Sequence, residues 1–480
     1  MDKSTSVFGN PIDEKTQKKA EKSKQKFIKR FGDDSEAVYH LGLKPITQIK
    51  EIKMQNLVFS DEPLTLPEKP LVVGNIRMGF GHYRISMAIA SCAQALGYNP
   101  LWLDLASFDA TGSKMISAQN DLYSMGSKLS QKVALFNKLY WEPLNSEGFR
   151  KITYNAADQK NAELLVPILA DLPKDVPYVA THVWPSQGAV HAGLTHVVNA
   201  IPDNWPMGLH LSEGAIHTVQ TPFAYLGYKM LNGMAKDSLA HIPDDALYQV
   251  GHYVDHELVA NIEEDCDSRI DRLDNDKPIR FLMTVGGAGA GADLYLAMIR
   301  HLASYLKDKK ATLIINFGDH LDMWEYIKKK LPGFEKNCKC FFDEYGKLEQ
   351  FAEMLDGDTA AGIYAVYNKD IFEAVYSTNL LMRRCDVLVT KPSELSFYPV
   401  PKLMMRHIGG HEVYGAIHAQ ELGDSTFECE DAASLCNMID ALIGDKMILK
   451  TMCRQIVDLK KSGVYDGGYK VVKLAVGERI

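Results

Sequence analysis

The chain has 480 residues, 46% hydrophobic and 24% charged, a composition typical of a soluble globular protein long enough for two domains. Its net charge of −8 argues against a general attraction to nucleic acid. No apolar run reaches the roughly 18 residues of a membrane span, and the N-terminus lacks a hydrophobic signal core. Together with eight scattered cysteines, these features predict a cytoplasmic protein with reduced thiols.

Residues 1–69 are predicted to form a polar N-terminal extension. Within it, residues 15–30 carry many cations, with Phe27 and Ile28 as the large apolar residues near the end. We interpret this run first as a solvated helix. The alternative is a basic surface helix in weak contact with an anionic membrane, which would make the protein peripheral to that membrane.

From residue 70 onward, short apolar runs alternate with longer helical patterns. The expected strands are PLVVGNI, PLWLDL, VPYVATHV, THVVNAI and AIHTVQT, followed after a pause near Gly251 by PIRFLMTV, ATLIINFGD and RCDVLVT. This alternation predicts parallel strands with helices on both faces. We therefore expect an α/β protein with two Rossmann-like domains facing a cleft, at 70–255 and 276–480, joined by a linker at 256–275.

A long helical stretch interrupts the alternation between residues 112 and 160. Its apolar positions fit a helix that packs on the first domain. Its aromatic residues could instead shape the entrance for an acceptor substrate.

The first glycine-rich segment joins a predicted strand to a predicted helix and reads GNIRMGFGHYRISMAIA from Gly74 to Ala90. Gly79 and Gly81 flank Phe80, His82 follows directly, and Arg84 comes two residues later. A histidine at such a junction can reach into a cleft and exchange a proton near neutral pH. A histidine that merely caps its helix is the equally weighted alternative.

The second glycine-rich segment follows the strand FLMTV and contains Gly286, Gly287 and Gly289. Small residues before a helix let backbone N–H groups approach an anion, and the helix dipole favours negative charge there. One glycine turn is weak evidence for a ligand site, but one such turn in each half is better evidence. No P-loop motif and no clean dinucleotide motif are present, so a P-loop ATPase is unsupported and a dehydrogenase is a weaker interpretation.

The third segment runs from Val387 to Asp424 and joins a strand end to two proline-broken apolar runs. It contains Lys391, Glu394 and the group Gly410, His411 and Glu412. Polar groups that follow consecutive strands suit a ligand cleft, whereas a proline-rich surface loop is the alternative. The pairs His252/His256 and His407/His411 lie beside glycines or in expected loops, so we predict no metal site, and no cofactor is required.

With these segments, the chain resembles GT-B glycosyltransferases of the type containing monogalactosyldiacylglycerol synthase and the peptidoglycan enzyme that glycosylates lipid I. The resemblance extends over about residues 70–430 and rests on motifs in the same order. These are GFGH with Ser86-Met87-Ala88, MTVGGAGAGAD, Val250–Val254, the strand end CDVLVTK, and Gly410-His411-Glu412 with a helix reaching Leu422-Gly423.

The chain departs from this family at two places. After the Thr-Lys pair it has Pro392-Ser393-Glu394 in place of a glycine-rich turn and an acid-bearing helix. Ala200 stands where the family has an aspartate, and Asp203 is nearby. These departures leave open a non-catalytic protein that binds nucleotide sugars.

The resemblance implies a transferase that moves a sugar from a nucleotide-diphosphate sugar, of the UDP type, to a lipid or small-molecule acceptor. It places Gly286, Gly287 and Gly289 near the diphosphate. It also implies that Lys391 adds positive charge, Glu394 holds a ribose hydroxyl, and Gly410 and His411 lie on the donor side. His82 and Glu412 are then the catalytic candidates, and Gly79, Gly81 and Arg84 form the acceptor-side loop. A nucleotide-sugar 2-epimerase or hydrolase on the same scaffold is the alternative enzyme, with Glu394 and Glu412 as its carboxylates.

Overall fold

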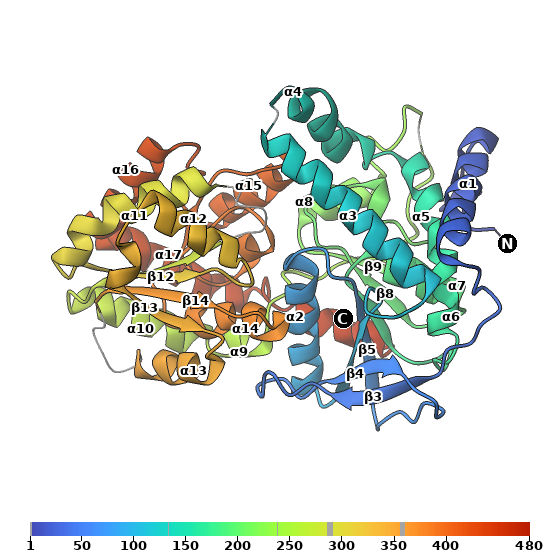
Figure 1. Cartoon of the computed structure of the whole chain (residues 1–480), viewed down its shortest axis with the longest axis horizontal. Helices are drawn as coiled ribbons and strands as arrows, with labels where there is room; N and C mark the ends of the chain where they lie inside the picture. The colour runs from blue at the N-terminus through green and yellow to red at the C-terminus, as the bar shows by residue number, and fades with distance from the viewer. Residues whose placement is uncertain (1, 133, 238, 286–290, 356–360) are drawn as a thin grey trace. The chain divides into compact units, whose positions relative to one another are not determined.

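The computed structural model describes residues 2–132, 134–237, 239–285, 291–355 and 361–480, and the chain divides into two α/β units (Figure 1). The first unit contains residues 1–256, 409–411 and 466–480. The second unit contains residues 257–408 and 412–465. The predicted fold class of two α/β domains with parallel sheets is therefore confirmed.

The first unit is built on an eight-stranded sheet in the order β10-β9-β8-β7-β5-β6-β4-β3. Only the edge pair β3–β4 is antiparallel. Its strands are β3 Leu41–Pro45, β4 Gln55–Phe59, β5 Pro70–Asn75, β6 Asn99–Asp104, β7 Tyr178–Ala180, β8 Val197–Ala200, β9 Ile216–Val219 and β10 Leu247–Gln249. Five of these strands, β5 to β9, match the five expected apolar runs.

The main helices of the first unit cover both faces of this sheet (Figure 1). They are α1 Glu14–Phe31, α2 Gly81–Ala95, α3 Thr111–Lys132, α5 Asn155–Ala162, α7 Val183–His191, α8 Pro222–Lys229 and α18 Gly467–Ala475. The long helix expected over residues 112–160 ends at Lys132. Short α-, π- and 3₁₀-helical turns follow it, namely α4 Ala134–Phe136, η1 Asn137–Trp141, η2 Leu144–Gly148 and η3 Ile152–Tyr154. In the part of the chain that is described, no helix is both long and apolar enough to cross a membrane.

Gly74 lets a tyrosine lie directly over strand β5. A Cβ atom at Gly74 would be 2.0 Å from Oη of the buried Tyr178 on the neighbouring strand β7. We therefore expect Gly74→Ala to lower the free energy of unfolding of the first unit by about 1–3 kcal/mol, because the interior has no room for the methyl group. ¹⁹F NMR of 5-fluorotryptophan at Trp102 during urea unfolding measures this loss. Gly346→Ala is the control, since no atom lies within 4 Å of that Cβ position, and equal unfolding curves for both variants would contradict the prediction.

The second unit is built on a six-stranded, fully parallel sheet in the order β13-β14-β12-β11-β15-β16. Its strands are β11 Ile279–Thr284, β12 Ala311–Asn316, β13 Cys338–Phe342, β14 Ile363–Tyr367, β15 Val387–Thr390 and β16 Lys402–Met404. The helices are α9 His256–Ala260, α10 Ile262–Asp274, α11 Ala292–Lys307, α12 Leu321–Lys330, α13 Tyr345–Met354, α14 Ile371–Met382, α15 Val413–Leu422, α16 Ala432–Gly444 and α17 Lys446–Lys461.

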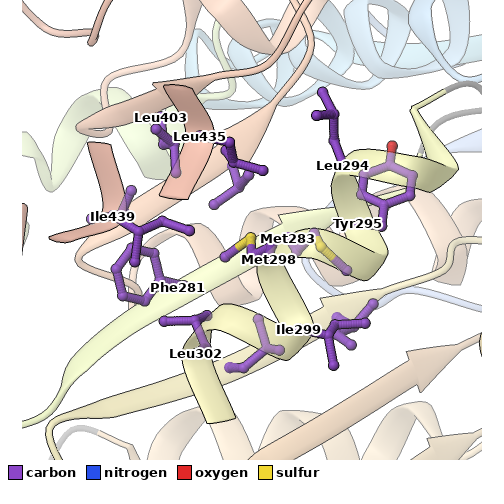
Figure 2. Close-up of a cluster of buried hydrophobic side chains, with 14 of the residues drawn as sticks. Phe281, Met283, Leu294, Tyr295, Met298, Ile299, Leu302, Leu403, Leu435 and Ile439 are labelled. Atoms are coloured by element: carbon purple, nitrogen blue, oxygen red, sulfur yellow. The ribbon is translucent and has the colours of Figure 1, made fainter. Parts of the chain in front are cut away.

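Helix α11 covers strand β11 with one apolar face (Figure 2). Leu294, Met298 and Leu302 recur every four residues and lie in one core cluster with Phe281 and Met283 of β11. This spacing places them on one side of a helix, and each buried side chain of this size contributes about 1.5–3 kcal/mol to folding. The packing holds the start of α11 close to the end of β11.

Three predicted domain boundaries differ from the structure. Residues 1–69 belong to the first unit because β3 and β4 extend its sheet and α1 packs against α5. Residues 256–275 form α9 and α10, and the buried Arg269 of α10 donates hydrogen bonds to the carbonyl oxygens of Met382 and Cys385 at 2.8 Å. The C-terminal helix α18 packs against α2 of the first unit. In each case, tertiary contacts decide the assignment.

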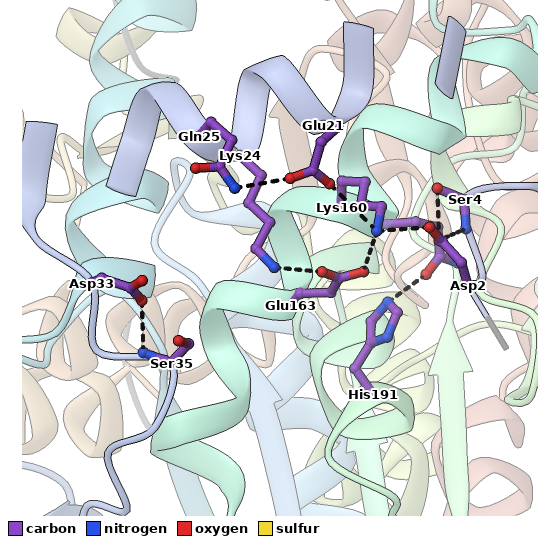
Figure 3. Close-up of polar contacts among 11 residues, drawn as sticks. Asp2, Ser4, Glu21, Lys24, Gln25, Asp33, Ser35, Lys160, Glu163 and His191 are labelled. Carbon is purple, nitrogen blue, oxygen red and sulfur yellow. Dashed lines mark hydrogen bonds and ion pairs between the residues drawn. The ribbon is translucent and has the colours of Figure 1, made fainter. Parts of the chain in front are cut away.

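Lys160 of α5 ties the N-terminal residues to the first unit (Figure 3). Its Nζ atom lies 2.8 Å from Oδ2 of Asp2, 3.0 Å from Oε1 of Glu163 and 3.6 Å from Oε2 of Glu21 on α1. Lys24 of α1 donates to the other oxygen of Glu163 at 2.6 Å. Partial burial raises the pKa of Asp2, but hydrogen bonds from Lys160 and Ser4 outweigh it and lower the pKa to about 2. The N-terminal segment is thus held by charge as well as by packing.

Replacing Lys160 by methionine is expected to destabilise the first unit by about 1–3 kcal/mol, because three carboxylates lose a common partner. The stabilisation that Asp2 contributes is fully present above its usual pKa of 3.8, and it is lost as the pH falls towards 2. The difference in Tm between the wild type and Lys160→Met should therefore shrink between pH 5 and pH 2.5. Lys18→Met serves as the control, because the Lys18–Glu14 pair is exposed and contributes about 0–1 kcal/mol. A Tm difference that stays constant with pH would contradict the role of Asp2.

Candidate functional site

Each sheet has a topological switch point, where the strands that come later in the chain are added on both sides of one strand. In the first unit, β5 pairs with β6 on one side and with β7 on the other. In the second unit, β11 pairs with β12 and with β15. Ligands of open parallel sheets bind beyond the carboxyl ends of the strands at such switch points. The residues that follow β5, β7, β11 and β15 are therefore the first candidates for a site.

The glycine-rich segment after β5 leads into α2 at the switch point of the first unit. Gly79 has φ of +80°, a backbone conformation that favours glycine, and Gly81 is the first residue of α2. Arg84 was expected in an acceptor-side loop, but it lies within α2 and is only 4% exposed. The helix begins earlier than the sequence pattern indicated, and this places Arg84 in the interior.

His82 is held by a hydrogen bond to the end of the neighbouring strand β7. Its Nδ1 atom lies 2.6 Å from the carbonyl oxygen of Thr181. Because a carbonyl oxygen only accepts, Nδ1 must carry the proton, and in the neutral ring the lone pair is then on Nε2. The structure thus gives His82 the tautomer that a general base requires.

A second histidine, His182, lies at this switch point and was not recognised in the sequence. It follows β7 and caps α7, with its Nδ1 accepting a hydrogen bond from the backbone N–H of Trp184 at 3.2 Å. The rings of His82 and His182 meet edge to face with centroids 4.9 Å apart. The criterion that singled out His82, a histidine between a strand and a helix, applies equally to His182 in THVWP.

Asp203 and His210 add an ion pair after the next strand, β8. Nε2 of His210 lies 2.9 Å from Oδ2 of Asp203. Burial raises the pKa of Asp203, but the hydrogen bond and positive charge of His210 outweigh it and hold the pKa well below its usual range. Ala200 ends β8, so the nearby acid lies beyond the strand. We call His82, His182, Asp203 and His210 the histidine cluster.

In the second unit, Lys391 and Glu412 form an ion pair beyond the end of β15. Oε2 of Glu412 also accepts a hydrogen bond from the backbone N–H of Ile408 at 2.8 Å. Burial lowers the pKa of Lys391, but the charge of Glu412 and, more weakly, that of Glu394 raise it above its usual value. Lys391 therefore stays protonated, and two carboxylates lie close to it. We call Lys391, Glu394 and Glu412 the lysine cluster.

The remaining predicted donor residues do not all join this cluster. Gly286, Gly287 and Gly289 lie outside the described residues. The helix that follows them, α11, begins at Ala292 after Gly291, which has φ of +84°. Gly410 and His411 lie in a short 3₁₀ turn with Glu412, and their contacts group them with the first unit.

The described residues contain no group of three or more histidine, cysteine, aspartate or glutamate side chains arranged to hold a metal ion. Two of the four paired histidines have other partners. Nδ1 of His256 lies 2.6 Å from Oη of Tyr469, and Nδ1 of His407 lies 2.6 Å from Oε1 of Glu428. Among the described residues, we therefore take the histidine cluster and the lysine cluster as the candidate functional groups.

Comparison with known proteins adds two family matches. A model described as "Domain of unknown function (DUF6937)" matches residues 6–230, and one described as "Domain of unknown function (DUF6938)" matches residues 242–476. No curated protein matches the chain.

Two of the similar solved structures are enzymes that act on or form UDP compounds. UDP-GlcNAc 2-epimerase from Neisseria meningitidis bound to UDP-GlcNAc has 10% identity and a TM-score of 0.42, and the alignment covers 85% of this chain and 97% of the epimerase. An α,α-trehalose-phosphate synthase (UDP-forming) from Burkholderia vietnamiensis has 12% identity and a TM-score of 0.44, with coverage of 85% and 98%.

Proposed function

We propose that this protein is a glycosyltransferase that moves a sugar from a nucleoside-diphosphate sugar, of the UDP type, to a hydroxyl acceptor. The main support is the tautomer of His82. At the switch point of the first unit, a hydrogen bond to Thr181 gives this ring the unprotonated Nε2 that removal of a hydroxyl proton requires. The sequence resemblance supplies the donor class.

In the proposed reaction, Nε2 of His82 takes the proton of the acceptor hydroxyl as its oxygen attacks the anomeric carbon of the sugar. The bond between that carbon and the diphosphate oxygen breaks, and the nucleoside diphosphate leaves with its bonding electrons. Lys391 and the backbone N–H groups at the start of α11 would stabilise the negative charge that develops on the diphosphate. Glu412 would keep Lys391 charged and oriented towards this group.

A lipid acceptor is supported by an exposed apolar surface on α3 and the turns after it. Leu122, Met125, Leu135 and Leu139 are each 62–67% exposed, so only part of this segment packs on the domain as expected, through residues such as Met115 and Ile116. Residues 111–141 also contain four lysines and a single aspartate. A segment with exposed apolar side chains and an excess of lysine in its sequence suits an anionic lipid interface.

The basic run at residues 15–30 is a poorer candidate for membrane contact than the surface on α3. Its two large apolar residues, Phe27 and Ile28, are partly buried and pack against the core of the first unit. The run therefore offers charge without an apolar anchor. Binding of the full-length protein to vesicles with 30% phosphatidylglycerol should fall with Leu122→Ser/Met125→Ser and remain with Lys15→Ala/Lys22→Ala.

A 2-epimerase or hydrolase of nucleotide sugars is a second candidate, because Glu394 and Glu412 both lie near Lys391. Such an enzyme needs carboxylates beside the sugar, and Glu394 and Glu412 are the candidates for them. Product analysis by NMR distinguishes the two. An epimerised or hydrolysed sugar formed without any acceptor alcohol would favour this candidate over a transferase.

The first test is calorimetric binding of UDP, GDP, dTDP and CMP, with NAD and ATP as other nucleotides. We expect one nucleoside diphosphate to bind, and Lys391→Met to weaken it about 10–100-fold, because a charged hydrogen bond to phosphate contributes about 1.5–3 kcal/mol. Glu394→Ala should also weaken binding if Glu394 holds the ribose. Lys450→Met is the matched control, since Lys450 pairs with Asp274 away from the lysine cluster. Binding of no nucleotide would overturn the proposal, and binding without turnover would leave a nucleotide-sugar-binding protein.

A further inference from the structure

His182 has the opposite tautomer to His82. Its Nδ1 accepts the N–H of Trp184, so the proton of the neutral ring must be on Nε2. Within the described part of the chain, no residue forms a hydrogen bond with this Nε2 atom. The ring is fixed by the cap and by an edge-to-face contact with Trp184, whose Nε1 donates to Oδ1 of Asp158 at 2.9 Å.

His182 also stays neutral over the physiological pH range. It is 5% exposed, and burial lowers its pKa well below the usual value. Positive charge on His82 or His210 lowers the pKa further, and Asp203 opposes this only in part. The Nε2–H group is therefore a permanent hydrogen-bond donor.

The two adjacent rings consequently present complementary groups. His82 provides an acceptor at Nε2, and His182 provides a donor at Nε2, on rings whose centroids are 4.9 Å apart. An alcohol hydroxyl donates one hydrogen bond and accepts others, so it has both of the groups that the two rings require. A protonated amine has no lone pair to accept from His182, and a carboxylate has no proton to donate to His82.

We propose that His182 is a second substrate-binding residue, whose Nε2–H binds the acceptor oxygen while its proton passes to Nε2 of His82, so that the pair selects an alcohol as acceptor. This inference rests on the proposed transferase function. It extends that function by naming the residue that holds the acceptor oxygen and the reason an alcohol is selected. In the reaction the hydrogen bond from His182 orients one lone pair, and another lone pair attacks the sugar.

Asparagine at position 182 separates this role from the structural one. Its side-chain oxygen can take the place of Nδ1 and still cap α7, since asparagine is a favoured N-cap residue, but it has no group at the position of Nε2. His191→Asn is the matched control, because His191 lies on the same helix and burial also lowers its pKa. The readout is release of UDP from UDP-glucose, UDP-galactose and UDP-N-acetylglucosamine, with n-octanol or n-octylamine as acceptor.

We expect His182→Asn to keep the Tm and the affinity for UDP, and to lower kcat/KM for the alcohol about 10–100-fold, whereas His191→Asn leaves it unchanged. Long-range ¹H–¹⁵N NMR of the wild type should show an Nε2–H tautomer for His182 and an Nδ1–H tautomer for His82 at pH 7. Three results would each overturn this inference and leave the transferase function standing. They are wild-type kinetics for His182→Asn, transfer to the amine as fast as to the alcohol, and an Nδ1–H tautomer of His182. A wild type that turns over no nucleotide sugar would overturn the transferase function as well.

Discussion

His82→Asn is expected to lower kcat/KM for sugar transfer by about 10²–10⁴-fold, which is the usual contribution of a general base. The amount of folded protein should not change. The side-chain nitrogen of asparagine takes the place of Nδ1 and keeps the hydrogen bond to the carbonyl oxygen of Thr181. The variant therefore removes the basic Nε2 while it keeps this hydrogen bond. Steady-state release of UDP measures the loss, and unchanged Tm confirms that the fold is retained.

His256→Asn controls for the removal of an imidazole from the same unit. Nδ1 of His256 also forms a short hydrogen bond, 2.6 Å to Oη of Tyr469, outside the histidine cluster. We expect this variant to retain wild-type turnover. If His82→Asn also retains it, then His82 is a structural residue that links α2 to the residues after β7.

The largest effect on stability is expected from Lys402→Met, which should destabilise the second unit by about 3–5 kcal/mol. Lys402 and Asp424 form an ion pair at 2.7 Å with exposures of 0% and 1%. Nζ of Lys402 also donates to the carbonyl oxygens of Tyr398 and Val400, and Tyr465 donates to Asp424 at 3.1 Å. Without Lys402, a buried carboxylate loses its counter-ion.

The double variant Lys402→Met/Asp424→Asn tests this cause directly. Burial already lowers the pKa of Lys402 and raises that of Asp424, so neutral replacements of both side chains relieve the cost of desolvation. We expect the double variant to recover most of the stability lost in the single variant. ¹⁹F NMR of Trp324, the one tryptophan in the sequence of the second unit, follows urea unfolding of that unit alone. A double variant less stable than the single one would show that the pair stabilises the unit by itself.

The strands that the sequence predicted correctly are those with continuous apolar runs. β5, β11 and β12 are buried on both faces, so their composition alone distinguishes them from helices and loops. Two of the missed strands, β13 and β16, lack that signal, whereas β14 reads IYAVY and was missed although it has an apolar run. β13 reads CKCFF and lies half exposed at an edge, and β16 has three residues that include the buried Lys402. A charged residue in the interior is explained only by its partner, Asp424, which lies 22 positions away.

The candidate site was predicted only in part, because some of its features follow from local sequence and others from contacts between distant residues. The position of His82 after a strand is a local pattern, whereas its tautomer depends on Thr181, almost one hundred residues away. The ion pair between Lys391 and Glu412 likewise depends on how η10 Gly410–Glu412 folds back towards β15. Local sequence can identify the groups that carry chemistry, but long-range contacts set their protonation and partners.

The position of helix α18 at the end of the sequence affects the order in which the two units can complete their folding during translation. A Cβ atom at Gly467 would lie 2.3 Å from the carbonyl oxygen of Gly251, so this glycine allows the C-terminal helix to approach a segment synthesised more than two hundred residues earlier. During translation, every strand of the first unit leaves the ribosome long before α18 does. The second unit, whose residues end at Tyr465, can therefore complete its fold while the first still exposes the face of α2 that α18 will cover. The N-terminal half of this chain is the last to be finished, and a nascent chain stalled before residue 466 would expose that apolar face to chaperones.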